Sequence, residues 1–538
     1  MLKRLPILLA LVVTVALPFI FRPKQVAVER ADETLVIITP HNEALRYEFG
    51  RGFGEWYRAK TGKTVKVDWR VIGGTSEINR FLEGEYDAAF QLHWTRTLRR
   101  NWSAEIQSGY KNYKLPADAS VEVKEAREAF LKSDVSCGID LFFGGGTPDF
   151  LKQAQAGRLV NCGVIERHPD WFGDDAIPQE FCGERYWDAR GLWIGAVLSN
   201  FGIISNRDSL KRLGVSAELR QWEDLANPRL VGEIALSDPT KSSSIAKAFE
   251  NIIQQQMQKR LLALRAANPD ADPAQIEKQA VREGWIAGLR LMQLIGANSR
   301  YFTDTSQKPP IDVAQGNSAA GICIDFYGRQ QDEAVLRRAE KQRLSFVAPQ
   351  GGTVNSVDPI ALLRGAANRE VAVAFIDYVL SMDGQKIWNF RPGTPGGTHR
   401  FALRRLPVRR DFYQQAEFKQ WCSDPTDAPY AATEQLIYRP AWTGSLFREM
   451  SFIIRVMCLD THKELTDAWR AIIAAGQPAD ALAVLQDLAA VDLAVANGRV
   501  KQALNAKDKT EELRLSRDLG DLFRAQYRKA EELARAKK

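Results

Sequence analysis

Histidine and cysteine are scarce in this sequence: its 538 residues include five histidines and six cysteines. The histidines are scattered, and none belongs to the HExxH pattern of zinc proteases. No cysteine pair has the CxxC or Cys/His spacing of a structural zinc site. The G-x-S-x-G nucleophile elbow and the G-x-x-x-x-G-K-[ST] phosphate loop are also missing. These absences argue against the enzyme classes that the motifs mark, and we expect neither catalytic residues nor a cofactor.

The body of the chain has no excess of basic side chains, although the net charge is +7. Residues 1–30 carry five basic and one acidic side chains, and residues 501–538 carry eleven and seven. Each end therefore contributes +4, and everything between them sums to −1. A neutral body offers no basic surface, so no nucleic-acid partner is expected.

Only one apolar run approaches the length of a membrane span. It extends from Leu5 to Phe21, behind Lys3 and Arg4. A charged start followed by such a run is typical of a secretory signal, and its 17 residues equal the lower limit for a spanning helix. We interpret residues 1–30 as a signal peptide or an N-terminal membrane anchor, with both alternatives open.

The remaining chain is predicted to be one exported soluble part, periplasmic or otherwise extracytoplasmic. Its composition, 45% hydrophobic and 26% charged, is that of an ordinary globular protein. In an oxidising compartment some of the cysteines can pair, although the sequence does not determine which. The candidate pairs are Cys162 with Cys182 and Cys422 with Cys458, whereas Cys137 and Cys323 are candidate core thiols.

Strand and helix patterns alternate from residue 33 to about residue 400. Residues 35–38 form an apolar β-branched run, residues 45–56 place apolar side chains on one helix face, and residues 65–69 alternate as a second strand. This order is a βαβ unit, which requires a parallel sheet. Strand patterns stop after residue 400, so residues 401–538 are predicted to be an α-helical extension.

Three predicted strand ends share one design, because each leads through Gly, Ser or Thr residues into a helix. A helix N-terminus presents free backbone N–H groups and partial positive charge, and small residues let a ligand approach. Ser and Thr are also ordinary helix caps, so one such loop is a weak indication. Three in one α/β core indicate a site for a small anionic or zwitterionic ligand. The segments are 73–76, 144–147 and 240–244.

Three more side chains lie at predicted strand ends. His41 directly follows the first strand, a ligand-facing position in open α/β sheets, where imidazole binds a metal or an anion. The alternative is a helix-terminus histidine bonded to solvent. Asp325 is placed to meet a ligand cation, and Tyr327 offers a phenolic oxygen or, alternatively, is a packed ring.

Several segments, taken in order, resemble extracellular solute-binding proteins of ABC importers. The branch most similar is that of the type-2 periplasmic binding proteins, which includes binders of ferric iron, thiamine and phosphorylated sugars. The resemblance covers about residues 33–400, and it depends on the order and spacing of six segments rather than on any one motif. The segments are 35–43 (LVIITPHNE), 62–67 (GKTVKV), 73–77 (GGTSE), 139–150 (IDLFFGGGTPDF), 222–228 and 238–244.

The resemblance implies two α/β lobes that are joined by crossing strands and close on a ligand by a hinge motion. Lobe one would comprise residues 33–200 and 350–400, and lobe two residues 201–349. The family's ligand positions fall on His41, Gly74, Thr75, Ser76, Gly145, Gly146, Thr147, Ser242, Ser243, Ser244, Asp325 and Tyr327.

Ferric binders of this branch carry two adjacent tyrosines where this chain has Phe326-Tyr327. An iron site would therefore use His41, Glu77 and Tyr327 together with a bound anion. The hydroxyl-rich helix ends suit a phosphate or carboxylate better. Thiamine or its phosphate stays open, with Asp325 or Tyr327 at the cationic ring.

The expected function is that of a non-enzymatic substrate-binding component of an ABC transporter. Its solute would be small and anionic or zwitterionic: an organophosphate, a thiamine-type molecule, or ferric iron with an anion. Its partner would be an ABC permease in the inner membrane. Two alternatives stay open: an exported hydrolase or transferase that uses His41, and a membrane-tethered sensor or scaffold that acts through residues 401–538.

Overall fold

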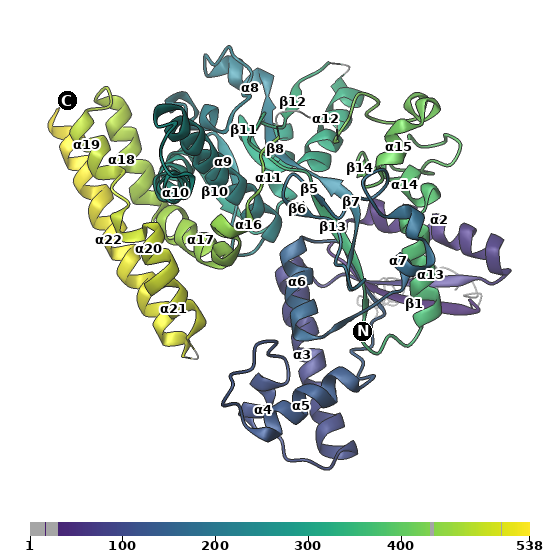
Figure 1. The fold of residues 1–538 in the computed structure, drawn as a ribbon. Helices are drawn as coiled ribbons and strands as arrows, with labels where there is room; N and C mark the ends of the chain where they lie inside the picture. The colour runs from purple at the N-terminus through teal and green to yellow at the C-terminus, as the bar shows by residue number, and fades with distance from the viewer. Residues whose placement is uncertain (1–16, 18–30, 340, 431–434, 507, 538) are drawn as a thin grey trace, which may run out of the picture.

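The computed structural model describes residues 17, 31–339, 341–430, 435–506 and 508–537. They form two α/β lobes and a group of C-terminal helices (Figure 1). The predicted signal or anchor segment, residues 5–21, lies outside the described residues except for Leu17. Within the described ranges, no helix is long and apolar enough to cross a membrane.

The first lobe is built on a mixed sheet with the strand order β14-β7-β13-β3-β1-β2, and β4 pairs with β13. β1 pairs in parallel with β2 and β3, whereas β13 runs antiparallel to β3 and β7. The predicted βαβ unit is confirmed. The strands are β1 (Glu33–Ile38), β2 (Val65–Arg70), β3 (Leu141–Phe143), β4 (Leu159–Val160), β7 (Ile194–Ser199), β13 (Ser356–Leu363) and β14 (Leu406–Pro407).

The helices of the first lobe begin and end at residues that suit those positions. In α2 (Glu43–Thr61), the Asn42 side chain accepts a hydrogen bond from the Leu45 N–H at 3.1 Å, and Gly62 ends the helix with a φ of 76°. A two-stranded ribbon, β5 (Glu180–Phe181) with β6 (Glu184–Arg185), projects from this lobe. The other helices are α3 (Thr75–Leu92), α4 (Ala104–Gly109), α5 (Val121–Lys132), α6 (Thr147–Ala156), α7 (Val164–Arg167), α13 (Arg369–Leu380), α14 (Met382–Asn389) and α15 (Arg410–Gln414).

The second lobe contains a five-stranded sheet with the order β10-β9-β11-β8-β12. Its strands are β8 (Phe201–Asn206), β9 (Ile234–Ser237), β10 (Ser299–Thr303), β11 (Ala320–Ile324) and β12 (Leu344–Val347). Its helices are α8 (Arg207–Arg212), α9 (Ser243–Ala267), α10 (Pro273–Asn298), α11 (Lys308–Gln315) and α12 (Asp325–Ala339). The two-lobed α/β fold that the sequence predicts is therefore present.

The chain passes from the first sheet to the second at one residue, Asn200, and returns between β12 and β13. The two passages lie side by side. The Asn200 Nδ2 donates to Asn355 Oδ1 at 3.1 Å, and the Phe201 N–H donates to Thr353 Oγ1 at 3.1 Å. These bonds couple the two connections, which form a short pair of strands between the lobes.

Residues 401–430 differ from the sequence interpretation, which placed them in the helical extension. β14 pairs with β7 in the first sheet, and Tyr430 packs against Phe181. A two-residue strand is too short to show a strand period, which explains why the pattern was missed. The chain then reaches the second lobe, where the Gln254 side chain bonds to both the N–H and the C=O of Arg439.

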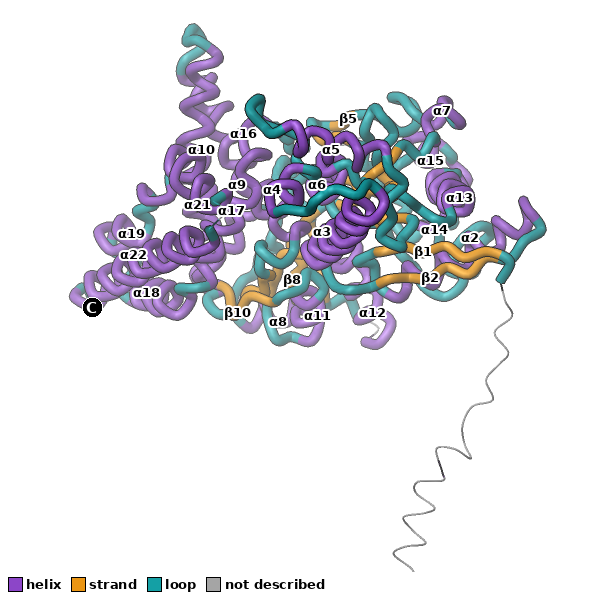
Figure 2. Tube along the Cα trace, turned by 90° about the horizontal axis from the view of Figure 1, so that it is seen from below, coloured by secondary structure: helices purple, strands orange, loops and turns teal. Residues whose placement is uncertain are grey.

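The C-terminal helices share one continuous hydrophobic core with the second lobe. The Trp285 Nε1 on α10 donates to the Val491 carbonyl at 3.0 Å. Figures 1 and 2 both place the helices after residue 461 against α10, on the side of the second lobe away from the first. The C-terminal helices are α16 (Pro440–Thr443), α17 (Phe447–Ile454), α18 (His462–Ala474), α19 (Ala479–Leu485), α20 (Leu493–Val495), α21 (Lys501–Asn505) and α22 (Lys509–Ala536).

All six cysteines are free thiols, so neither candidate disulfide is present. Cys458 lies in the core of the second lobe, whereas Cys422 lies in a small cluster with Phe390. These two cysteines therefore belong to separate cores, which is why they do not meet.

Two glycines in helices give a matched test of the α9–α10 contact. A Cβ at Gly284 on α10 would lie 2.3 Å from the Met257 Cα on α9, whereas a Cβ at Gly54 on α2 would meet nothing within 4 Å. We expect Gly284→Ala to lower the free energy of unfolding by about 1–3 kcal/mol through overpacking. Gly54→Ala should raise it by about 0.5–1 kcal/mol. Urea unfolding measures both, and an equal effect of the two variants would contradict the close α9–α10 packing.

Candidate functional site

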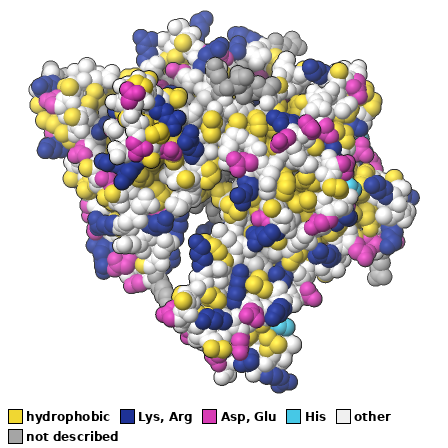
Figure 3. All heavy atoms as spheres, in the orientation of Figure 1, with side chains coloured by type: hydrophobic (Ala, Val, Ile, Leu, Met, Phe, Trp, Pro, Cys, Tyr) yellow, Lys and Arg dark blue, Asp and Glu magenta, His cyan; other side chains and the backbone are white. Residues whose placement is uncertain are grey.

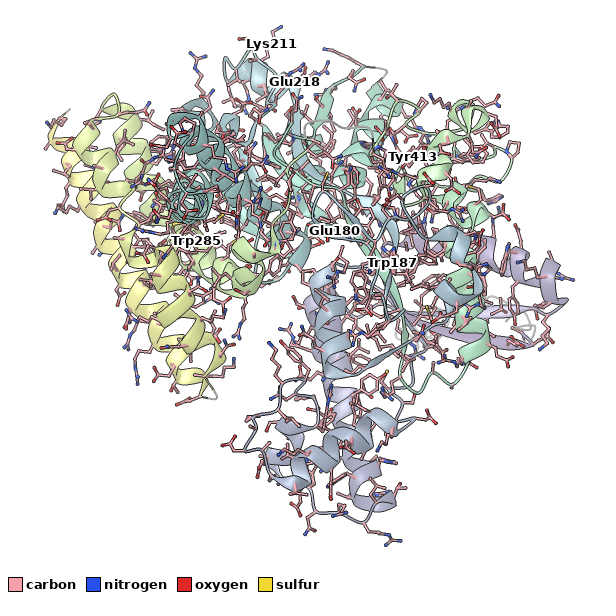
Figure 4. The ribbon with its side chains drawn as sticks, viewed as in Figure 1. Glu180, Trp187, Lys211, Glu218, Trp285 and Tyr413 are labelled. Atoms are coloured by element: carbon pink, nitrogen blue, oxygen red, sulfur yellow. The ribbon has the colours of Figure 1, made fainter. Side chains whose placement is uncertain are left out.

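A cavity of about 380 Å³ lies between the lobes. It is lined by α6 and the β5–β6 ribbon of the first lobe, by α9 of the second lobe, and by residues 438–447. Ser199, Phe201 and Asp358 on the crossing strands also line it. Figure 3 shows the surface hollowed between the lower part of the first lobe and the C-terminal helices, and Figure 4 labels Glu180 on the ribbon. The volume lies within the range of small-molecule sites, about 300–1,000 Å³.

The three predicted strand-end loops meet beside this cavity. The Thr75 and Ser243 hydroxyl oxygens are 2.5 Å apart, and Ser243 Oγ also donates to Asp149 Oδ2 at 3.0 Å. The same carboxylate oxygen accepts the Gly146 N–H at 3.2 Å. The N-termini of α6 and α9 therefore face each other from opposite lobes.

Five of the predicted ligand residues line the cavity: Gly145, Gly146, Thr147, Ser243 and Ser244. Thr147 Oγ1 and the nearby Ser356 Oγ are buried, and neither has a hydrogen-bond partner in the described part of the chain. These two hydroxyls can bond to a solute.

Four more predicted ligand residues are not among the described residues that line the cavity: Gly74, Thr75, Ser76 and Ser242. Thr75 contacts Ser243 directly, and Ser242 is the N-cap of α9, where it accepts the Ile245 N–H. Gly74 precedes α3 as its N-cap residue. Their positions are those of helix caps and supporting contacts around the cavity.

His41 belongs to a buried polar cluster that includes Asp358 and Arg405. Its Nε2 lies 3.7 Å from Asp358 Oδ2 and 3.5 Å from Arg405 Nη1. Burial lowers the pKa of His41 and so does the Arg405 charge, whereas its hydrogen bond with Asp358 opposes the shift. The ring is 6% exposed, so His41 lies behind the cavity wall that Asp358 forms.

Arg405 is the centre of this cluster, and the sequence interpretation did not identify it. Its guanidinium donates to Asp358 Oδ2 at 2.7 Å and to the Ser199 hydroxyl. It lies 4.3 Å from the ring of Phe326 on α12, a cation–π contact that reaches the second lobe. Burial raises the pKa of Asp358, but the charges and hydrogen bonds of Arg405 and His41 together outweigh burial, so the pKa is lowered.

Asp325 and Tyr327 lie at the start of α12, away from the cavity lining. The Asp325 N–H donates to the Asn200 carbonyl at 3.0 Å, and its side chain is fully buried. Neither of its carboxylate oxygens has a hydrogen-bond partner among the described residues. Burial raises the pKa of Asp325 to about 7, against the opposing charge of Arg329, and burial also raises the pKa of Tyr327 to about 12.

Lys247 and Glu184, which the sequence interpretation also missed, line the cavity and pair across the lobes. The Lys247 Nζ lies 2.6 Å from Glu184 Oε1 on the ribbon and 3.0 Å from Glu250 Oε2 on its own helix. It also lies 3.2 Å from the centre of the Tyr438 ring. One signal was present: Lys247 follows Ser243 by four residues, which places both on the same face of α9.

No group of three or more His, Cys, Asp and Glu side chains in the described ranges is arranged to hold a metal ion. Of the residues considered for iron, Glu77 is paired with Arg80 at 2.7 Å and His41 with Arg405 and Asp358. These two side chains considered for iron are therefore engaged with other residues and do not form a group of metal ligands.

The sequence model of the bacterial extracellular solute-binding protein family matches residues 138–412, and the chain belongs to this family. The match includes most of the cavity lining but ends before Tyr438. An uncharacterized protein of Haemophilus influenzae is 25% identical over 254 residues, which cover 46% of this chain and 60% of that protein. The phosphoglycerate transport regulatory protein PgtC of Salmonella typhimurium is 23% identical over 293 residues, 53% of this chain and 58% of that protein. The chain thus spans less than two thirds of these relatives.

Solved structures similar to this chain include periplasmic binding proteins. AfuA of Actinobacillus pleuropneumoniae, with fructose-6-phosphate bound, is 17% identical at a TM-score of 0.47, covering 82% of this chain and 98% of that protein. Ferric ion-binding protein A of Pasteurella haemolytica is 13% identical at a TM-score of 0.47, covering 79% and 97%.

The unpaired carboxylate of Asp325 predicts a pH-dependent stability. Its pKa is about 7 in the folded protein, against the ordinary aspartate value of 3.8. Between about pH 4 and pH 7, the folded state therefore binds more protons than the unfolded state, so the free energy of unfolding falls as the pH rises. The loss is about 1.4 kcal/mol per pH unit. Asp325→Asn removes this charge, so we expect its stability relative to the wild type to increase from pH 5 to pH 8, measured by urea unfolding.

Asp208→Asn is the control for this measurement. The hydrogen bond from Arg343 lowers the pKa of the exposed Asp208, so this carboxylate is ionised at both pH values. Its effect should be the same at pH 5 and pH 8. A pH-independent effect of Asp325→Asn would contradict the unpaired, buried state of that carboxylate.

Proposed function

We propose that the protein is the substrate-binding component of an ABC importer and that its cavity captures a small phosphorylated organic anion. The observation that carries this proposal is the meeting of two helix N-termini, one from each lobe, at a single cavity. Free N–H groups and the helix dipole favour an anion at such a position. Because each lobe supplies part of the donor set, an anion there stabilises the closed arrangement.

The hydroxyls around the cavity support a phosphate or carboxylate. Thr147 and Ser356 present unbonded hydroxyl oxygens, and a phosphate has enough acceptor oxygens for both. Asp358 is paired with Arg405, and Lys247 is shared between Glu184 and Glu250. The name of the relative PgtC, a phosphoglycerate transport regulatory protein, supports the same solute class.

Iron and thiamine receive less support. A ferric site lacks a group of metal-binding side chains in the described residues. The cation contacts considered for thiamine, Asp325 and Tyr327, are not among the described residues that line the cavity. Of the three expected solute classes, the cavity therefore favours an organophosphate over a thiamine-type molecule or ferric iron.

Binding without bond making is supported by the position of His41. It is enclosed against Arg405 and Asp358, so it is poorly placed to act on a solute as the exported-enzyme alternative requires. The proposal includes an extracytoplasmic location and an ABC permease as the partner. A tether formed by residues 5–21 stays a prediction.

A sensor is the second candidate function. The relative PgtC is named as a transport regulatory protein, and residues 435–447 link the cavity to the C-terminal helices. In this case, the same anion would be bound, but its occupancy would be signalled to a partner rather than delivered to a permease.

Ser244→Asp tests the anion site without disturbing the helix. An acidic residue in the first turn of α9 suits the helix dipole, yet it places a negative charge where the solute anion would lie. A thermal-shift panel would contain sugar phosphates, phosphonates, thiamine forms, ferric iron and polyamines. We expect phosphorylated anions to raise the melting temperature of the wild type and Ser244→Asp to abolish the rise.

Ala274→Asp is the matched control, since Ala274 occupies the same first-turn position in α10 and is absent from the described cavity lining. This variant should keep the wild-type response. Silence of the wild type across the panel, or an undiminished response of Ser244→Asp, would contradict the proposed function.

Uptake by cells separates the carrier from the sensor. If the chain delivers solute to a permease, deletion of its gene should abolish uptake of the bound solute even when the permease is expressed from an unrelated promoter. If it is a sensor, that forced expression should restore uptake. Radiolabelled solute measures both outcomes, and restored uptake would contradict the carrier.

A further inference from the structure

The Lys247 ammonium is held by carboxylates from both lobes. Glu250 comes from the same helix, α9, and Glu184 comes from the β5–β6 ribbon of the first lobe. The side chains of Lys247 and Glu184 are 10% and 5% exposed, so the pair is largely removed from water. Burial opposes the charge of Lys247, but the two carboxylates hold its pKa above the ordinary value.

The two carboxylates are not equally fixed. Glu250 Oε1 accepts hydrogen bonds from the Tyr438 hydroxyl at 3.0 Å and from Thr443 Oγ1 at 2.6 Å, while its Oε2 faces Lys247. Glu184 is paired with Lys247 alone among the described residues. Burial raises the pKa of Glu184, since one cation only partly offsets the loss of water. Of the two carboxylates, Glu184 is therefore the one that another anion can displace from Lys247 more easily.

We propose that Lys247 binds a second anionic group of the solute and that this group takes the place of the Glu184 carboxylate. This inference rests on the proposed function and adds the substrate class: a short organic acid with a phosphate at one end and a carboxylate at the other. The phosphate lies at the facing N-termini of α6 and α9, and the carboxylate lies at Lys247.

The geometry of α9 sets the spacing of the two groups. Ser243 and Lys247 are four residues apart on one helix, which corresponds to about 6 Å along the axis. Both residues line the same cavity. A chain of a few carbon atoms between phosphate and carboxylate spans this distance, whereas a solute with a single anionic group reaches only one end.

Tyr438 positions the ammonium for this exchange. Its ring lies 3.2 Å from the Lys247 Nζ, and its hydroxyl bonds to Glu250, so Lys247 keeps two neighbours when Glu184 leaves. The Tyr438 backbone is itself fixed, because its N–H donates to the Cys182 carbonyl at 2.9 Å. A Cβ at Gly183 would lie 1.8 Å from the Tyr438 carbonyl oxygen, so only glycine permits this contact.

The test is isothermal titration of the full chain with 3-phosphoglycerate and with glycerol 3-phosphate, which lacks the carboxylate. We expect the wild type to bind 3-phosphoglycerate more tightly. Lys247→Met should weaken 3-phosphoglycerate binding by about tenfold or more and glycerol 3-phosphate binding by less than about threefold, because only the former loses a charged partner. Glu184→Gln should tighten 3-phosphoglycerate binding by about threefold or more, because it removes a competing anion.

The matched controls are Lys259→Met and Glu223→Gln, which break an exposed pair between α9 and the segment 222–226, where Lys259 Nζ and Glu223 Oε1 lie 2.5 Å apart. They should leave both affinities unchanged. Should Lys247→Met fail to fold because it leaves buried carboxylates unpaired, the combination with Glu184→Gln removes one of them, and Glu184→Gln alone still tests the exchange.

The inference is overturned if Lys247→Met weakens both probes equally, if Glu184→Gln weakens 3-phosphoglycerate binding, or if the wild type does not prefer 3-phosphoglycerate. These results leave the proposed function standing when another phosphorylated anion stabilises the protein in the thermal-shift panel. Silence across that panel removes the proposed function as well.

Discussion

The arrangement of the two lobes depends on one buried ion pair, that between Arg405 and Asp358. Arg405 is 1% exposed, so removing Asp358 would leave the Arg405 charge buried without a carboxylate partner, which typically costs about 3–5 kcal/mol. The pair joins β13 to the segment before β14, and through Ser199 and Phe326 it reaches the strand end at the crossing and the second lobe. Since Asp358 and Ser199 also line the cavity, the position of the cavity wall depends on the same contacts.

The elements with a regular hydrophobic period could be predicted from the sequence. β1 is a continuous apolar run, β2 alternates polar and apolar residues, and α2 buries one face with a period of 3.6 residues. β14 could not be predicted, because two residues show no period, and its place in the sheet depends on pairing with β7, about 200 residues earlier. The limit of the first lobe was consequently placed too early in the sequence.

The candidate site also contains residues that could be predicted from the sequence and residues that could not. The Gly, Ser and Thr loops are local signals: parallel strands β2 and β3 bring two of them to one edge of the first sheet, and the third reaches Asp149 from the second lobe. Arg405, Glu184 and Tyr438 come from irregular segments, where neither period nor motif marks a role. Their role in the site depends on contacts between residues far apart in the chain. Glu184 and Lys247, for example, form an ion pair although 63 positions separate them. Sequence patterns indicate local structure and do not identify such contacts.

The attachment of the C-terminal helices to the second lobe has a mechanical consequence. α22 contains 28 residues and is therefore about 42 Å long, and it lies with its neighbours on the side of α10 away from the first lobe. The second lobe and these helices share one core, so any rotation of the second lobe relative to the first would carry the helices with it. Displacement in a rotation grows with distance from the axis. In such a rotation the outer helices would move through a longer arc than the cavity wall, so their position would change more than the cavity itself.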